Sequence, residues 1–387
     1  MKFTAHPLWL VGFRPFFALT CLAGLSLPVV WALMFSGRLP APAASFSSFQ
    51  WHAHEMFYGF GWALLGGFLL TSTKNWVRIR GWHGGALAFL AAAWVLERAG
   101  MAFGGEWPPL LFALSNHLFL WSIVGMILWS LLRHRESDAF RTDNLYFVAM
   151  LPLFLVAKVL LLGAETFADG WQMTLALFRL AFLIMFERTL TQFMKGVFHV
   201  DVLRDPRLDN AIKGLALVLV FVPFLPAPLA ALGELLLAGL LIARFAGWHP
   251  RLALSRLDIG VSYAGYLALV AQLLLDALAV VAPVAWVGTV SVHVFTFGVM
   301  GLVSPAMIIR ISNGHTGRPV RFGRADKAAL HAMMLGFVLR IVGPQFVPAA
   351  YLHWIWGAAA CWLVAFGILA WRYIPFLLAP RADGKEH

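Results

Sequence analysis

The chain has 387 residues, of which 61% are hydrophobic and only 12% are charged, with a formal net charge of +11. Soluble domains carry about 25% charged residues, so this composition excludes an ordinary soluble protein and indicates a polytopic membrane protein. The basic residues gather in alternate loops, which argues against nucleic-acid binding and makes the charge a topology signal, with a secondary attraction to anionic membrane lipid.

About twelve apolar runs approach the roughly 20 residues that a helix needs to cross the hydrocarbon core of a bilayer. They lie at 12–36, 52–72, 83–100, 108–132, 144–163, 171–194, 211–228, 230–246, 258–281, 285–310, 327–348 and 353–378. The loops that hold most lysines and arginines are expected inside, so both termini are predicted to be cytoplasmic. We therefore predict an all-α polytopic protein with one membrane domain over residues 1–387 and a polar C-terminal tail at 379–387.

The segment that opens the second run, residues 51–60, contains His52, His54 and Glu55. Ionisable side chains at such a position are costly and by default mark function. On a helix the two histidines would point about 200° apart, whereas an extended segment would let both reach one ion. We predict that His54 faces the bundle as a haem ligand, and that His52 and Glu55 belong to a second, more exposed centre.

Further histidines fall at a similar depth in other runs. His117 lies about 13 Å and His293 about 12 Å below the outer ends of their spans, from the rise per residue of a helix, and His353 begins the last span. A single histidine near a helix end is more often structural, and the apolar face around His293 could be plain helix packing. Convergence at one depth favours a metal centre, because imidazole commonly binds metals and haem iron. The candidate metal ligands are His52, His54, His117, His293 and His353.

Charged side chains also occur at membrane depth. Cations near the outer side could neutralise the propionates of haem b through charge-assisted hydrogen bonds, although snorkelling at helix ends is the alternative. The candidates are Arg98, Lys158, Arg179 and Arg340. Intramembrane carboxylates recur in proton relays, and Glu187 and Glu55 are the candidates for a proton path. Two more carboxylates, Glu234 and Asp276, lie near predicted outer ends, where solvation alone could account for them.

Several motifs together resemble the NnrS family of bacterial inner-membrane proteins. They are residues 12–17, 51–56 with Gly59 and Phe60, 67–71 with Asn75 and Trp76, 293–298, 307–310 and 314–318. The resemblance implies haem b and copper as cofactors and a multi-pass protein of the bacterial cytoplasmic membrane. It also implies a role in the response to nitric oxide, under nitrosative stress and in denitrification.

The layout is similar to that of the central subunit of haem–copper oxidases and nitric oxide reductases. Those proteins also have twelve spans, with haem-ligating histidines on spans 2 and 10, and His54 and His293 occupy comparable places. However, span 10 of this chain has a single histidine in its outer half, and spans 6 and 7 have none where the second metal would be held. Any dinuclear centre would therefore be built differently.

The resemblance implies a protein that binds or detoxifies nitric oxide. If it turns over, it would be an oxidoreductase of the nitric oxide reductase type, with an electron donor that the sequence does not identify. Two alternatives come from other classes. One is a transporter that uses buried charges as its substrate path. The other is a metal-dependent membrane sensor without turnover, which signals through residues 314–318.

Overall fold

The computed structural model describes residues 3–41, 46–202 and 204–385. All regular elements in these residues are helices, and nine of them are long and apolar enough to cross a membrane. The prediction of an all-α polytopic membrane protein is therefore confirmed. The nine are α1 (Phe13–Phe35), α4 (Gly85–Phe103), α5 (Pro109–Arg133), α6 (Asn144–Leu162), α9 (Ala227–Ala246), α11 (Leu257–Val281), the run of α12 (Val290–Phe295), η7 (Thr296–Gly301) and α13 (Leu302–His315), α14 (Arg324–Ile341) with α15 (Gly343–Phe346), and α16 (Tyr351–Leu378).

The three other predicted spans are also helical. They are the run of α2 (Ser48–His54), η3 (Glu55–Gly61) and α3 (Trp62–Trp76), the helix α7 (Phe167–Phe198), and α8 (Pro206–Val218) with η6 (Leu219–Phe224). Each of the twelve predicted segments is thus mostly helical, although residues 285–289 of the predicted span 285–310 lie before the start of α12. The number of membrane crossings stays a prediction. Short helices complete the described chain: η1 (Phe3–Ala5), η2 (Pro7–Trp9), η4 (Gly104–Glu106), η5 (Arg135–Ser137), α10 (Pro250–Leu254) and η8 (Pro348–Ala350).

The chain divides into two compact units, each made of separate stretches of sequence. The first comprises residues 1–170, 308–321 and 362–387, and the second comprises 171–307 and 322–361. Three helices, α7, α13 and α16, continue from one unit into the other. The prediction of a single membrane domain with a separate tail at 379–387 stays a prediction.

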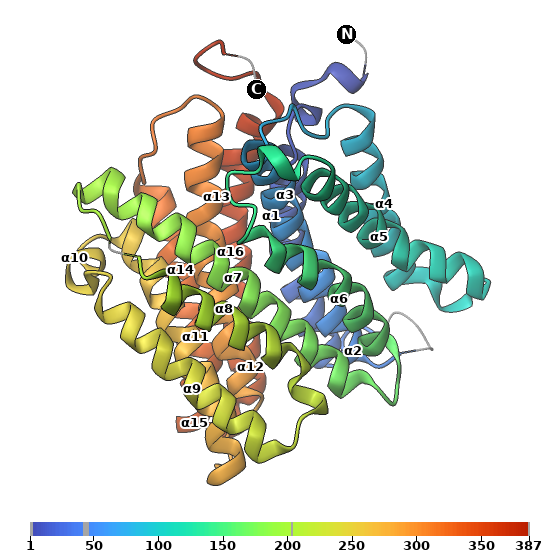
Figure 1. Ribbon diagram of the computed structural model, residues 1–387. Helices are drawn as coiled ribbons and strands as arrows, with labels where there is room; N and C mark the ends of the chain where they lie inside the picture. The colour runs from blue at the N-terminus through green and yellow to red at the C-terminus, as the bar shows by residue number, and fades with distance from the viewer. Residues whose placement is uncertain (1–2, 42–45, 203, 386–387) are drawn as a thin grey trace. The chain divides into compact units, whose positions relative to one another are not determined.

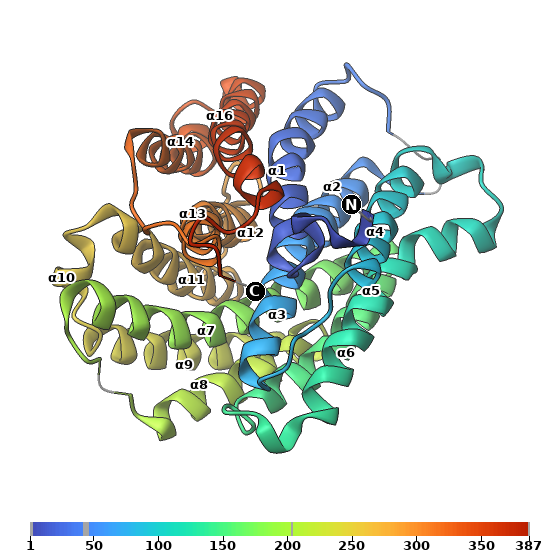
Figure 2. The same cartoon turned by 90° about the horizontal axis from the view of Figure 1, so that it is seen from above.

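In the first unit, α4 runs alongside α5 (Figures 1 and 2), and α1 packs against α3. The motif at the start of α1 has a structural role there. Arg14 is buried, and its Nη1 donates to the carbonyl oxygens of Leu377 and Ala379, both at 2.7 Å. The backbone N–H of Phe13 donates to Thr71 Oγ1 at 2.8 Å. The start of α1 is thereby tied to the end of α16 and to α3, which satisfies a buried cation with backbone acceptors.

In the second unit, α9 packs along α11 (Figure 1). Two buried tyrosines of α11 join the helices, because Tyr263 donates to the carbonyl of Trp248 at 2.7 Å and Tyr266 donates to that of Leu241 at 3.0 Å. These hydrogen bonds compensate for the water that the buried hydroxyls lose on folding. The apolar helices of this unit are therefore held together by polar contacts as well as by packing.

Candidate functional site

His54 and His293 each stand just before a π-helical segment. His54 directly precedes η3, and His293 lies three residues before η7. Each histidine is followed five residues later by a glycine, Gly59 in one case and Gly298 in the other. π-Helical turns are rare, and they frequently occur at functional sites. The shared spacing of histidine and glycine is visible in the sequence and marks both π-helical segments, whereas the apolar runs alone do not distinguish them from α-helix.

His54 is fully buried in the first unit and lies between two buried carboxylates. Its Nδ1 is 3.0 Å from Glu55 Oε1, and its Nε2 is 3.2 Å from Glu97 Oε1. The prediction that His54 faces the interior agrees with this burial. Glu97 was not among the predicted site residues. Its position beside Arg98 within an apolar span was the available signal, because carboxylates at membrane depth are rare.

Two of the predicted cations bind these carboxylates. Arg98 places Nε 3.0 Å from Glu55 Oε2 and Nη2 2.9 Å from Glu97 Oε1. Lys158, also fully buried, places Nζ 2.5 Å from Glu97 Oε1 and donates to the carbonyl of Asn116. The two carboxylates and two cations balance in formal charge, and buried charges persist only when paired in this way. We refer to His54, Glu55, Glu97, Arg98 and Lys158 as the His54 cluster.

Aromatic side chains border the His54 cluster. The Arg98 guanidinium lies 5.1 Å from the ring centre of Trp94, whose Nε1 donates to the carbonyl of Gly59 at 3.0 Å. Lys158 Nζ lies 5.4 Å from the ring centre of Tyr58. A Cβ at Gly59 would lie only 2.6 Å from Arg98 Nη1. The glycine in η3 therefore makes room for the cation that binds Glu55.

The prediction that Glu55 lies in a more exposed centre is wrong, because Glu55 is 2% exposed and its carboxylate contacts His54 and Arg98. The physical reason is the positive charge that Arg98 of α4 brings to Glu55. A second centre that contains His52 stays a prediction. His52 stacks on Trp31, with ring centroids 4.2 Å apart. His117 is half-buried in α5, next to the residue whose carbonyl accepts from Lys158.

In the second unit, His293 has a different environment. Its Nδ1 lies 2.8 Å from the carbonyl oxygen of Thr289 and 2.9 Å from Thr289 Oγ1, and its Nε2 lies 3.3 Å from Arg340 Nη2. Since a carbonyl only accepts, Nδ1 carries the proton and Nε2 carries the lone pair. Arg340 Nη1 also donates to the Tyr351 hydroxyl at 3.2 Å. The structure thus brings His293 and Arg340 together, whereas His353 is exposed near the start of α16.

Glu187 lies in a buried ion-pair network of the second unit. Its carboxylate contacts Arg204, lies 3.2 Å from Lys213 Nζ and lies 3.6 Å from Arg244 Nη1. Asp209 shares two of these cations, at 3.1 Å from Arg204 and 3.2 Å from Arg244. Such a network compensates the charge of each buried carboxylate. The proton path through Glu187 stays a prediction.

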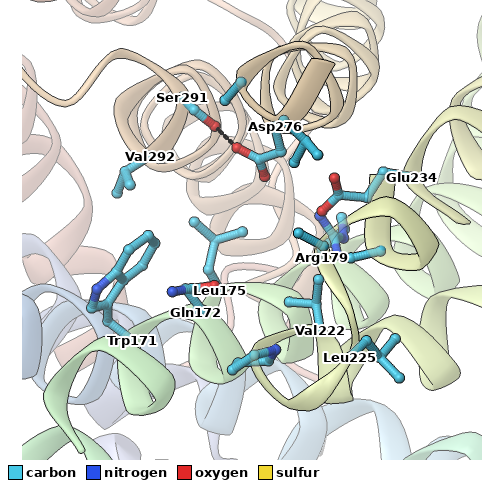
Figure 3. Close-up of a pocket in the computed structure, with 15 residues that line it drawn as sticks. Trp171, Gln172, Leu175, Arg179, Val222, Leu225, Glu234, Asp276, Ser291 and Val292 are labelled. Carbon is cyan, nitrogen blue, oxygen red and sulfur yellow. Dashed lines mark hydrogen bonds between the residues drawn. The ribbon is translucent and has the colours of Figure 1, made fainter. Parts of the chain in front are cut away.

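Arg179, the remaining predicted cation, lines a cavity of about 400 Å³ in the second unit (Figure 3). Its Nη1 donates to Gln272 Oε1 at 3.1 Å. Glu234 lines the same cavity and is only 4% exposed, so solvation does not account for it. Glu234 is buried because α9 directs its side chain toward the interior of the unit. The positions of apolar runs in the sequence do not show this direction.

The five predicted metal ligands are divided between the units. His52, His54 and His117 belong to the first unit, and His293 and His353 belong to the second. Within the described part of the chain, no three histidine, cysteine, aspartate or glutamate side chains form a group that could hold a metal ion. The convergence of the five at one centre therefore stays a prediction.

A comparison with models of protein families finds one family that matches this chain. A search of curated proteins finds no match. The family model of the NnrS protein matches residues 7–381, which includes both histidine segments and the loop at 314–318. This match fits a multi-pass membrane protein of the nitric oxide response. The chain therefore belongs to the NnrS family.

Proposed function

We propose that this protein binds haem b through His293 and, at that haem, binds nitric oxide in the bacterial cytoplasmic membrane, protecting the cell under nitrosative stress. Copper, which the family resemblance implies, belongs to the same proposal as a second metal. The hydrogen-bond pattern of His293, just before the π-helical η7, carries the proposal. When bound, haem supplies an iron that can coordinate nitric oxide.

The His293 side chain could hold a haem. Metal-binding histidines almost always donate their second ring N–H to a carbonyl, a carboxylate or water, which fixes the ring and the tautomer. Nδ1 of His293 has this partner in the carbonyl of Thr289, which leaves the lone pair on Nε2. Metal ligation by Nε2 requires that Arg340 Nη2, 3.3 Å away, move aside. Haem iron needs only one or two side chains from the protein. Arg340 lies close enough to Nε2 to hold a nearby anionic group such as a propionate.

The His54 side chain fits the same role less well. Its Nδ1 faces the Glu55 carboxylate, as in a carboxylate–histidine–metal arrangement. Its Nε2 faces Glu97, so metal ligation by this nitrogen requires that the Glu97 carboxylate leave it. The present contacts support a proton role instead, because an imidazole between two carboxylates can hold a proton at either nitrogen. This supports Glu55 as part of a proton path.

Turnover would need more than these residues. Reduction of nitric oxide consumes electrons and protons, so a reductase of this type needs an external electron donor. The His54 cluster could supply protons, because it contains the titratable groups His54, Glu55 and Glu97 in direct contact. The alternative of a transporter has one observation in its favour, the charged cavity at Arg179.

The optical spectrum of the purified full-length protein tests the proposal. We expect a Soret band that shifts when nitric oxide is added without oxygen. Steady-state loss of nitric oxide in liposomes that contain the protein and a reductant would identify turnover, whereas binding without loss would favour a sensor or carrier. A colourless protein without iron or copper would contradict the proposal and favour a transporter.

A further inference from the structure

The cavity of about 400 Å³ in the second unit has charged walls. Its size lies in the range of roughly 300–1,000 Å³ that is typical of small-molecule sites. Figure 3 shows side chains from α7, α9, α11 and α12 around it. The residues with polar groups or large rings on its walls are Trp171, Gln172, Arg179, Glu234, Asp276 and Ser291.

Arg179 has an unused hydrogen-bonding edge in this cavity. The residue is 1% exposed, and one guanidinium nitrogen, Nη1, donates to Gln272. The other two nitrogens, Nε and Nη2, are buried and have no hydrogen-bond partner among the described residues. Arginine stays charged in proteins, and buried donors are rarely left unpaired. Nε and Nη2 together form the edge that binds a planar oxyanion such as a carboxylate in bidentate fashion.

Two carboxylates share the cavity with this cation. Glu234 is buried and directs its carboxylate toward Arg179 (Figure 3). Asp276 accepts hydrogen bonds from Ser291 and Gln272. With one cation and two carboxylates on the walls, a bare anion on Arg179 would be repelled by the acidic side chains, whereas a bare cation beside Glu234 would leave the Arg179 donors unpaired. These forces are strong where the dielectric constant is low.

We propose that this cavity binds a small zwitterion. The carboxylate of the ligand pairs with the Nε and Nη2 edge of Arg179, and its cationic group lies against Glu234. Such a ligand satisfies the unpaired donors and meets both signs of charge on the walls. The site is distinct from His293 and does not require a bound haem or metal.

Isothermal titration of the full-length protein in detergent tests this site. The zwitterions are glycine, proline, 4-aminobutyrate and glycine betaine, and the single-charge probes are acetate and methylammonium. We expect at least one zwitterion to bind about tenfold or more tighter than either single-charge probe, a ratio that calorimetry resolves readily. If no zwitterion binds, or if acetate binds as tightly as the best zwitterion, the proposal is overturned.

Substitutions then test which side chain sets the preference for a zwitterion over acetate. Glu234→Gln keeps the shape of the side chain and removes its charge, so acetate should gain about tenfold in affinity while the zwitterion loses a similar factor. Arg179→Gln should abolish the binding of acetate and of the zwitterions, because each of them carries a carboxylate. Arg256→Gln, at an exposed ion pair with Asp258, is the matched control and should change nothing.

An unchanged ratio of zwitterion to acetate affinity in Glu234→Gln would overturn the proposal even if Arg179→Gln does not fold. Because these titrations do not depend on haem content, their failure would leave the proposed nitric oxide function untouched. The spectrum of the protein decides that function separately.

Discussion

Glu97 is the side chain on which the His54 cluster depends. Its Oε1 lies within 3.2 Å of His54 Nε2, 2.9 Å of Arg98 Nη2 and 2.5 Å of Lys158 Nζ. When one partner of a buried ion pair is removed, the other charge stays buried without a counter-charge. The loss of stability is then far larger than the stability that the intact pair contributes. Glu97 therefore makes it possible for Lys158 to be charged without any exposure to solvent.

We expect Glu97→Gln to destabilise the protein by about 3–5 kcal/mol, because the isosteric amide leaves Lys158 buried without its counter-charge. Denaturant unfolding in detergent, followed by tryptophan fluorescence, measures the loss. Asp201→Asn is the control, since its ion pair with Lys195 is 70% to 77% exposed and should contribute little. Equal unfolding midpoints for the Glu97 variant and the wild type would contradict this account, whereas partial recovery in the Glu97→Gln, Lys158→Met double variant would support it.

The positions of the helices could be predicted from the sequence, but whether a segment is α-helical or π-helical could not. The predicted spans 144–163 and 353–378 correspond to α6 (Asn144–Leu162) and α16 (Tyr351–Leu378), because polar residues or glycine and proline border long apolar runs. The π-helical segments η3 and η7 were not predicted, since apolar composition is the same for α- and π-helical turns. The partnership of Glu97 with His54 was missed because it joins α2 and α4, and contacts between spans leave no pattern within either span.

The junction of α6 and α7 gives a prediction at this scale. A Cβ at Gly170, near the start of α7, would overlap backbone atoms of Leu160 and Leu161. Backbone cannot move aside as a flexible side chain can, so Gly170→Ala should lower the melting temperature. Gly196→Ala on the same helix meets no atom within 4 Å and should be neutral or stabilising by up to about 1 kcal/mol. Identical melting temperatures for the two variants would show that α7 does not pass this close to α6.

For the whole molecule, the alternation of basic loops predicts the orientation in the membrane. The loop between α5 and α6 contains Arg135 and Arg141, and the loop between α13 and α14 contains Arg318 and Arg321, whereas the loop between η6 and α9 has no cation. From the positive-inside rule we therefore predict that the first two loops and both termini lie in the cytoplasm.

Reporter fusions check this orientation. Green fluorescent protein fused to the C-terminus should fluoresce, because it folds in the cytoplasm. Alkaline phosphatase should be active when fused after Leu225 and inactive when fused after Arg318. The opposite pattern of phosphatase activity would show that the inner and outer ends of the histidine-bearing helices have been exchanged.

The family was also predictable from the sequence, because the motifs that carry it are contiguous segments such as residues 51–56 and 314–318. The division into two units was not, because both units combine stretches from distant parts of the chain. Apolar runs mark helices one at a time and do not say which helices pack together. Hence the charged environments of His54 and His293 emerged only from the structure.

The haem content of His293→Ala tests the central claim most directly. Wild type, His293→Ala and His331→Ala, which alters an exposed histidine of α14, are purified in the same detergent, and haem per protein is measured by the pyridine haemochrome spectrum. All three should elute as the same folded species. We predict that wild type and His331→Ala retain haem and that His293→Ala loses it, because His293 is the proposed haem ligand and His54 Nε2 faces Glu97. Full haem content in a folded His293→Ala protein would contradict the claim.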